Sequence, residues 1–454
     1  MHEMRPRLGQ RCATLPLVTA LSVLLAGCGN DKSPDSTAAA GNATTGGATG
    51  GKSGGTGGKS GGTGGKSGST GGTGTGTGGK SGTGGTGTGT GGKSGTGTGG
   101  STTVPIGGGK SSAADIARKL GREPNFLIGM GNDLPSDYKW ETAPVYSRGA
   151  PLDIHYIYLS KGWEDWNPGG YFAQVIANVD VTKGVTPMST VYAITGQGEN
   201  TFGVLVDDSY MTPYWAAAKV LMQRYAEIDV PAIVHLEPDF WAYAEQKSAG
   251  DPSSVPAHLH PDCQSLPQDV SGMARCWIKL ARDNAPKVVI GLHASEWAGG
   301  SGNEVGGFLN KLGAAEADLV VIDMLDRDAG CFEDGKLSQC MRSGTFYLDE
   351  TNQKSPNYSE RLEFAKQVST TTGKPILWWQ LPFGVPSDTP GGTPGHFRDN
   401  KVHYLFSHVQ DFVDAGGVGA AFGTGAGDQT FITTDGGQFD AAVKAYYAAP
   451  VALP

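Results

Sequence analysis

Eight short apolar runs between residues 126 and 422 constrain the fold more than any other feature of the sequence. Most are rich in β-branched or aromatic side chains, which is typical of strands that are buried on both faces. The runs are residues 126–130, 152–159, 188–194, 232–237, 288–293, 319–324, 375–381 and 418–422. Eight such strands predict a large parallel sheet if helices connect them.

Helical patterns lie between most of these runs. They cover residues 171–179, 213–228, 270–284, 304–315, 361–370, 402–413 and 439–447, and a short helix over 112–120 precedes the first strand. Strands that alternate with helices are typical of an α/β fold, and eight units predict a (β/α)8 TIM-type barrel over residues 111–454. The first crossover, residues 134–150, carries no clear helix and is expected to be an irregular loop.

A doubly wound open sheet is the alternative fold. Its first strand is usually followed by Gly-x-Gly-x-x-Gly, and the segment that starts Gly129-Met-Gly131 does not complete that pattern.

Residues 28–110 form a low-complexity linker of Gly, Thr, Ser and Lys, which holds many of the 73 glycines of the chain. It has almost no apolar side chains to bury and is expected to be disordered. Residues 74–81 and 87–94 match the phosphate-loop pattern Gly-x4-Gly-Lys-Ser. Neither follows a strand or begins a helix, so we predict no nucleotide site and no cofactor. The net charge of −9 argues against nucleic acid as a partner, and we expect a monomer.

The N-terminus has the layout of an export signal. Arg5, Arg7 and Arg11 precede an apolar run over residues 15–26 that is too short to span a membrane as a helix. The run ends in Leu-Ala-Gly-Cys28, which resembles the lipobox of bacterial lipoproteins, and Gly29 follows. The resemblance implies that residues 1–27 are a signal peptide and that Cys28 is lipidated and anchored in a membrane. It also implies an exported outer-membrane lipoprotein that faces the periplasm or the cell surface.

Four cysteines remain after Cys12 and Cys28 are set aside, and an even number in an exported protein predicts disulfides. Short separations favour Cys263–Cys276 and Cys331–Cys340. A zinc site made by all four is the competing interpretation, but the sequence contains no Cys-x-x-Cys spacing.

Acidic and aromatic side chains gather where the predicted strands end, which is where barrel enzymes carry their chemistry. Strand alternation places His235 and Glu237 on one face. The candidate catalytic residues are Glu237, Asp239, Asp323 and Asp326. The candidate substrate-binding residues are Trp163, Trp166, Trp241, Trp297, Trp378, Trp379, Gln380, His235 and His293. Paired carboxylates beside indole rings are typical of sites that cleave polysaccharides or oligosaccharides.

Two sequence motifs resemble those of glycoside hydrolases. Glu237 followed by proline is similar to the end of strand four in the retaining (β/α)8 glycosidase clan, but Gln380 stands where that clan has its nucleophile. Glu237-Pro-Asp239 and Asp326-Arg327-Asp328 resemble motifs of glycoside hydrolase family six, in reversed order along the chain. In that family the aspartate of Glu-Pro-Asp is the proton donor. The resemblance implies hydrolysis by carboxylate general acid and base without a metal, and Gln380 favours inversion over retention.

Two other functions are compatible with these residues. A metal-dependent hydrolase or deacetylase would need His155, His235, Glu237, His293 and Asp323 to converge inside the barrel. A glycan-binding barrel lipoprotein without catalysis is the second, and Gln380 in the strand-seven position favours it.

Overall fold

The structure is a computed structural model. It describes residues 111–131, 144–147, 152–165, 172–198, 200–324, 348–383, 400–423, 432–433 and 435–454. The predicted signal peptide, Cys28 and the linker lie outside these residues, as do Trp166, Asp326, Cys331 and Cys340.

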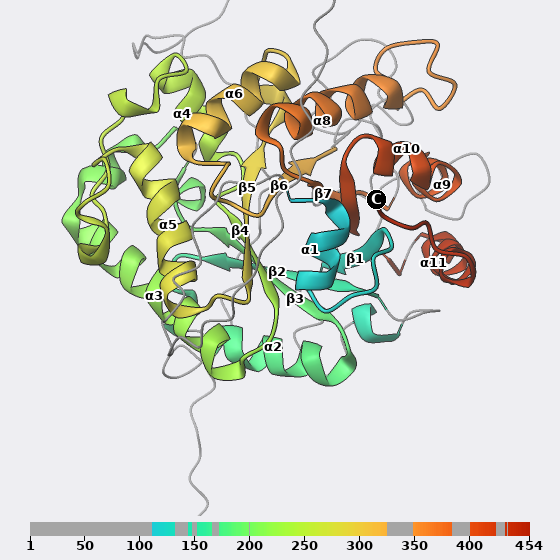
Figure 1. Ribbon diagram of the computed structural model, residues 1–454, viewed down its shortest axis with the longest axis horizontal. Helices are drawn as coiled ribbons and strands as arrows, with labels where there is room; N and C mark the ends of the chain where they lie inside the picture. Colours follow the sequence, from blue (N-terminus) through green and yellow to red (C-terminus); the bar gives the residue numbers. More distant parts are fainter. Residues whose placement is uncertain are drawn as a thin grey trace, which may run out of the picture. The chain divides into compact units, whose positions relative to one another are not determined.

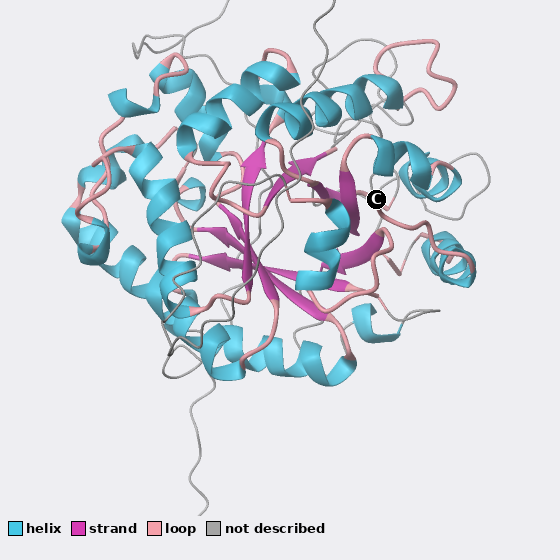
Figure 2. Ribbon diagram, in the orientation of Figure 1, coloured by secondary structure: helices cyan, strands magenta, loops and turns pink. Residues whose placement is uncertain are grey.

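Eight parallel strands form one closed barrel in the order in which they occur along the chain, as Figure 2 shows in magenta. The predicted (β/α)8 barrel is therefore confirmed, and the open-sheet alternative is wrong because β1 pairs with β8. The strands are β1 Leu127–Gly131, β2 Ile154–Ser160, β3 Thr186–Tyr192, β4 Ala232–Leu236, β5 Val288–Ala294, β6 Leu319–Asp323, β7 Ile376–Leu381 and β8 Gly417–Phe422.

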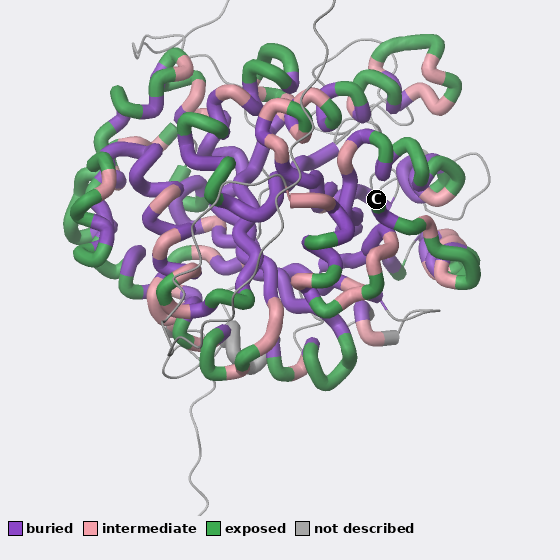
Figure 3. Tube along the Cα trace, in the orientation of Figure 1, coloured by how far each residue is buried: buried purple, intermediate pink, exposed green. Residues whose placement is uncertain are grey.

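Helices surround the barrel on its outer side (Figures 1 and 2). They are α1 Ala113–Lys119, α2 Phe172–Lys183, α3 Asp208–Ile228, α4 Phe240–Ser248, α5 Val270–Asn284, α6 Gly302–Leu312, α8 Tyr358–Thr372, α9 Asn400–Ser407, α10 Val409–Asp414 and α11 Gln438–Ala448. Figure 3 shows that burial is continuous through the barrel and the inner faces of the helices, whereas exposed residues follow the outer faces. This is the distribution expected when amphipathic helices cover a parallel sheet.

Predicted and observed boundaries differ by up to five residues at most elements, and three differences have a clear structural meaning. Strand β4 ends at Leu236 instead of residue 237, because Glu237 adopts a left-handed conformation with φ of 42°. Helix α4 follows Asp239 directly and was not predicted. The helix predicted over 402–413 is interrupted at His408, which separates α9 from α10. The described part of the first crossover is a short 3₁₀ turn over Pro144–Ser147.

Close packing between neighbouring strands explains one glycine in β1 and one in β8. A Cβ atom at Gly129 would lie 2.6 Å from the carbonyl oxygen of Ile154 in β2. A Cβ at Gly419 in β8 would lie 2.6 Å from the carbonyl oxygen of Leu127 in β1. Only glycine allows these backbones to approach so closely.

Two further features concern export and membranes. The predicted disulfide between Cys263 and Cys276 is present, with Cα atoms 5.6 Å apart, and it ties the loop before α5 to that helix. Within the ranges that the structure describes, no helix combines the length and the hydropathy that a bilayer crossing requires.

Candidate active site

Glu237 lies outside the barrel interior, between the strand ends and α3. Its Oε2 accepts hydrogen bonds from the backbone N–H groups of Ala193 at 3.1 Å and Ile194 at 3.0 Å, and the Tyr214 hydroxyl also donates to the carboxylate. Burial raises the pKa of Glu237 to about 8, although these donors lower it. The prediction that Glu237 and His235 lie on one face of the strand is wrong, because the positive φ at Glu237 ends the strand alternation.

His235 and His293 form a hydrogen-bonded pair inside the barrel. The Nε2 of His235 lies 3.0 Å from the Nδ1 of His293, and its Nδ1 lies 3.2 Å from the Oγ1 of Thr190 in β3. The ring of Trp379 packs edge-on against His235, with centroids 4.8 Å apart. Complete burial lowers the pKa of His235 well below its usual value, and the neighbouring His293 lowers it further, so the ring is neutral at pH 7.

His293 connects this pair to Asp323 at the end of β6. Its Nε2 lies 3.7 Å from the Oδ1 of Asp323. If His235 Nε2–H donates to His293 Nδ1, then His293 carries its own proton on Nε2, facing the carboxylate. If His293 Nδ1–H donated to His235 Nε2 instead, the lone pair of His293 Nε2 would face the carboxylate oxygen of Asp323. The geometry therefore favours a His293 that donates towards Asp323.

Four polar atoms in this region are buried and have no hydrogen-bond partner among the residues that the structure describes. They are His293 Nε2, Ser295 Oγ, Asp323 Oδ1 and Trp379 Nε1. They belong to the carboxyl ends of β5, β6 and β7 or to the residue that follows. Because buried polar groups in folded proteins are nearly always paired, this concentration indicates a place for water or for a polar ligand. We call these four residues the mouth cluster.

Asp239 lies beside an exposed indole. It occupies the N-cap position of α4 without a side-chain capping bond, and its Oδ1 instead accepts a hydrogen bond of 2.9 Å from Trp297 Nε1. Trp297 is 43% exposed, the highest exposure of any described tryptophan, and its ring contacts Tyr243 of α4. Neighbouring strands are about 4.8 Å apart, so the ends of β4 and β6 are separated by about 10 Å.

Glu296 was not among the predicted site residues, yet it lies at this end of the barrel. It forms an ion pair with Arg361 of α8. Burial raises its pKa, the Arg361 charge lowers it, and the negative charge of Asp323 raises it again, which places Glu296 within electrostatic reach of Asp323. Its position directly after the fifth strand was the signal in the sequence. Its partner Arg361, which lies in a distant helix, gave no such signal.

The predicted tryptophan platforms are found in different environments. Trp379 belongs to the mouth cluster, and Trp297 is exposed next to Asp239.

Trp378 is fully buried between the barrel wall and α10, where it packs on Phe412, so it cannot stack on a substrate in this structure. Trp241 is 1% exposed and its Nε1 donates to the carbonyl of Leu236, so it also cannot stack on a substrate in this structure. Trp163 lines a separate cavity outside the barrel.

Gln380 remains at the carboxyl end of β7, where its side-chain amide donates to the hydroxyl of Tyr158 in β2. It is in a left-handed conformation with φ of 56°, at a register shift between β7 and β8. An amide held in this way can bind a substrate hydroxyl but is not a nucleophile.

No protein-family model matches this chain, and no curated protein does. Solved structures do resemble it. A double mutant of an endo-β-1,4-mannanase from Cellulomonas fimi is 14% identical, with a TM-score of 0.47 and coverage of 76% of each chain. The endoglucanase Cel6 from Mycobacterium tuberculosis is 16% identical, with a TM-score of 0.31 and coverage of 61% of this chain and 73% of that one. A D-allulose 3-epimerase from Methylomonas sp. is 12% identical, with a TM-score of 0.37 and coverage of 72% and 96%. Each likeness is one of fold.

The ligands predicted for a metal-dependent enzyme do not converge. His155 faces away from the barrel axis, and its Nδ1 lies 2.8 Å from Asp180 of α2. Glu237 faces α3, so only His235, His293 and Asp323 of the five remain together inside. Across the described ranges, no group of three or more His, Cys, Asp and Glu side chains has the arrangement of a metal site.

Proposed function

We propose that this protein is a glycoside hydrolase whose active site lies around the mouth cluster. The observation that supports this proposal is the set of four buried polar atoms at the carboxyl ends of adjacent barrel strands that have no hydrogen-bond partner among the described residues. Acids and aromatic rings surround them, as a carbohydrate requires for its hydroxyls and for its apolar faces. The mannanase and endoglucanase neighbours have the same fold class.

In this mechanism Asp323 is the general base. Its unpaired Oδ1 is free to accept a proton from a water molecule, and the adjacent Nε2–H of His293 stabilises the ionised carboxylate. Asp239 is the general acid that protonates the leaving oxygen, the role that the Glu-Pro-Asp resemblance implies. The hydrogen bond from Trp297 to Oδ1 fixes the orientation of this carboxyl and leaves Oδ2 for the proton.

An acid at the start of α4 and a base at the end of β6, two strands from β4, favour inversion of configuration at the anomeric carbon. Inverting enzymes need about 6.5–9.5 Å between the carboxyls, because a water molecule must fit on the opposite face of the sugar. Glu296, only one strand from Asp323, would instead give a pair at the shorter spacing of about 5 Å that is typical of retention. The anomer of the first product, measured by proton NMR, distinguishes the two pairs.

The substrate is a polysaccharide or oligosaccharide that stacks on Trp297 near the exposed rim. The export signal and lipobox support a location at the outer membrane, where Cys28 anchors the protein and the linker holds the barrel away from the bilayer. Globomycin-sensitive processing and labelling by a radioactive fatty acid test the anchor, and a Cys28→Ser protein that still acquires label would contradict it.

Reducing-end release from a panel of polysaccharides tests the activity. We expect Asp323→Asn and Asp239→Asn each to lower turnover by about 10²–10⁴-fold, the usual contribution of a general acid or base. Asp283→Asn is the matched control, because Asp283 lies on the outer face of α5 with a side chain that is 50% exposed. Wild-type rates in both Asp323→Asn and Asp239→Asn would exclude this site.

A glycan-binding barrel without catalysis is the second candidate, and the amide at Gln380 favours it. Binding on a glycan array by the wild-type protein, with no product released from any bound glycan, would select this function over hydrolysis.

A further inference from the structure

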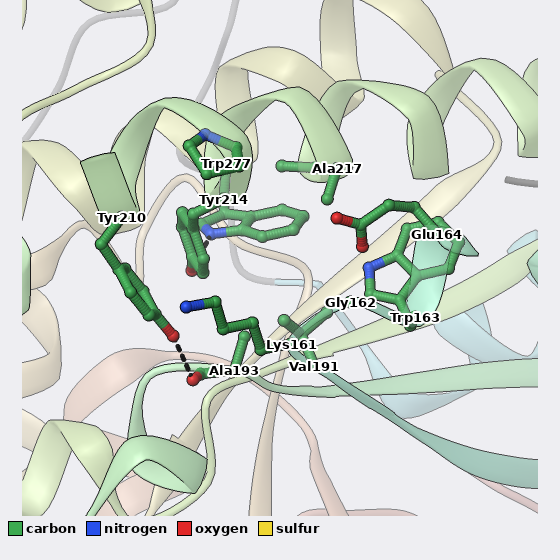
Figure 4. A pocket seen from close by; sticks show the side chains of 12 residues that line it. Lys161, Gly162, Trp163, Glu164, Val191, Ala193, Tyr210, Tyr214, Ala217 and Trp277 are labelled. Atoms are coloured by element: carbon green, nitrogen blue, oxygen red, sulfur yellow. Dashed lines mark hydrogen bonds between the residues drawn. The ribbon is translucent and has the colours of Figure 1, made fainter. Parts of the chain in front are cut away.

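A cavity of about 210 Å³ lies outside the barrel wall, between β3 and the helices α3 and α5 (Figure 4). Val191 of β3 lines this cavity. The preceding residue, Thr190, points to the other side of the strand, where it contacts His235 inside the barrel. Because neighbouring side chains of a strand face opposite sides, the wall of the barrel separates this cavity from the mouth cluster.

The sequence of α3 explains why there is space. Tyr210, Tyr214, Ala217 and Ala218 lie on one face of the helix at a spacing of four, three and one residues. The two alanines leave a gap beside the tyrosines, and the indole of Trp277 from α5 forms another wall. The cavity is thus bounded mainly by aromatic rings and methyl groups.

The tyrosine hydroxyls in this wall are already paired. Tyr210 donates to the carbonyl oxygen of Ala193 at 2.6 Å, which Figure 4 shows as a dashed line. Tyr214 accepts from Trp277 Nε1 at 2.8 Å and donates to Glu237. Neither hydroxyl therefore needs a ligand.

Two charged side chains extend into the same space from the segment after β2, as Figure 4 shows. The Oε2 of Glu164 is buried and has no hydrogen-bond partner within the described part of the chain. The Nζ of Lys161 lies 4.2 Å from the centroid of the Tyr210 ring, and Lys161 is exposed. A buried acceptor without a donor loses its hydrogen bonds to water and gains none from the protein, so a ligand that donates to Glu164 would be stabilised.

We propose that this cavity binds one pyranose ring of a neutral carbohydrate, at a site separate from the mouth cluster. A sugar hydroxyl donates to Glu164, another oxygen accepts from Lys161, and the C–H face of the ring packs on the aromatic wall. An apolar ligand would leave Glu164 unpaired, and a ligand with one charge would be attracted by one of these two side chains and repelled by the other. A cavity of about 150 Å³ holds benzene, so 210 Å³ accommodates one substituted six-membered ring. The choice of a carbohydrate rests on the proposed function.

Such a site would hold a terminal or branching sugar of a glycan while the mouth cluster acts on another bond. Trp163, predicted to bind substrate, contributes to this site and not to the mouth. Its side chain is 4% exposed, so it serves as an inner wall.

Isothermal titration of the full chain with methyl glycosides of glucose, mannose and galactose tests the proposal. We expect at least one glycoside to bind with a dissociation constant in the millimolar range. Ala217→Leu fills the cavity and should weaken that binding at least tenfold. Ala216→Leu is the matched control, since the neighbouring Ala216 is exposed on the same helix. Glu164→Gln, which keeps the shape of the side chain, should also weaken binding and covers the case in which Ala217→Leu does not fold.

The mouth variant Asp323→Asn separates this proposal from the proposed function. Binding that persists in Asp323→Asn and is lost in Ala217→Leu supports the outer site, whether or not the protein hydrolyses any glycan. Binding that is lost in Asp323→Asn and retained in both Ala217→Leu and Glu164→Gln places the sugar in the mouth and overturns the proposal. Absence of binding by all three glycosides also overturns it and leaves a cavity that holds only water.

Discussion

Replacement of Glu237 by glutamine gives the sharpest test of how this barrel uses its buried acid. The folded-state pKa of about 8 lies above the ordinary value of 4.5, so the folded protein binds a proton that the unfolded chain releases between these pH values. The stabilising contribution of the protonated Glu237 is complete below pH 4.5. It falls as the pH rises, and it is lost above pH 8.

The magnitude follows from the size of the shift. One pKa unit corresponds to about 1.36 kcal/mol, so a shift from 4.5 to about 8 corresponds to about 5 kcal/mol over the whole range. Between pH 5 and 7 the wild type should lose about 2–3 kcal/mol of unfolding free energy relative to Glu237→Gln, whose amide does not titrate. Glu245 and Glu296 also have raised pKa values, but both proteins contain them and their effect cancels in the difference.

Urea denaturation followed by tryptophan fluorescence at several pH values between 5 and 8 measures this difference. Glu363→Gln, a substitution at an exposed position of α8, should give a curve parallel to that of the wild type. If the stability difference between wild type and Glu237→Gln is constant over this range, Glu237 is already ionised in the folded protein. The donors from Ala193, Ile194 and Tyr214 would then outweigh burial, and the raised pKa of Glu237 would be refuted.

Four further predictions concern the histidine pair, the disulfide and two tryptophans. Nitrogen-15 NMR of His293 should show the Nε2–H tautomer, and His235→Phe should abolish this preference because it removes the donor. Cys276→Ser should lower the unfolding free energy by about 3 kcal/mol under oxidising conditions, as expected for a short loop, and a reductant should remove the difference from wild type. Trp378→Ala should cost about 3–5 kcal/mol in urea denaturation, because the ring is fully buried. Trp297→Ala should leave stability unchanged and raise the KM for a responsive glycan about threefold to tenfold, and an unchanged KM would exclude stacking there.

The barrel could be predicted from the sequence because its signal is repeated. Most strands are mainly apolar and each is followed by a turn or a helix, so an error at one boundary does not change the number of units. The site could be predicted only as a set of strand ends. Which acid faces the interior depends on single backbone angles, and the strand alternation that placed Glu237 with His235 fails at Glu237 itself, where φ is positive.

The tryptophans show the same limit in another way. Trp378 and Trp379 are neighbours in β7, so one must face the helices and the other the barrel interior. The sequence contains both rings but does not state which face is which, and both were expected to bind substrate. The contacts decide it, since Trp378 packs on Phe126 and Phe412, whereas Trp379 packs on His235 and on Tyr158.

Backbone strain provides an independent argument for where the function lies. Glu237, Asp239 and Gln380 all have positive φ, between 42° and 68°, although none is glycine. Each such residue costs of order 1–3 kcal/mol, and such strain persists only where the surrounding structure holds it, often at functional sites. Other positive-φ residues, such as Asp229 and Ala249, terminate helices, where this conformation is common. The three strained residues instead follow β4 or lie near the end of β7, at the end of the barrel that carries the mouth cluster.

The turn around Pro238 directs the two acids of the Glu-Pro-Asp motif to different surroundings. Glu237 lies in the layer between the barrel and α3, and Asp239 lies against the indole of Trp297.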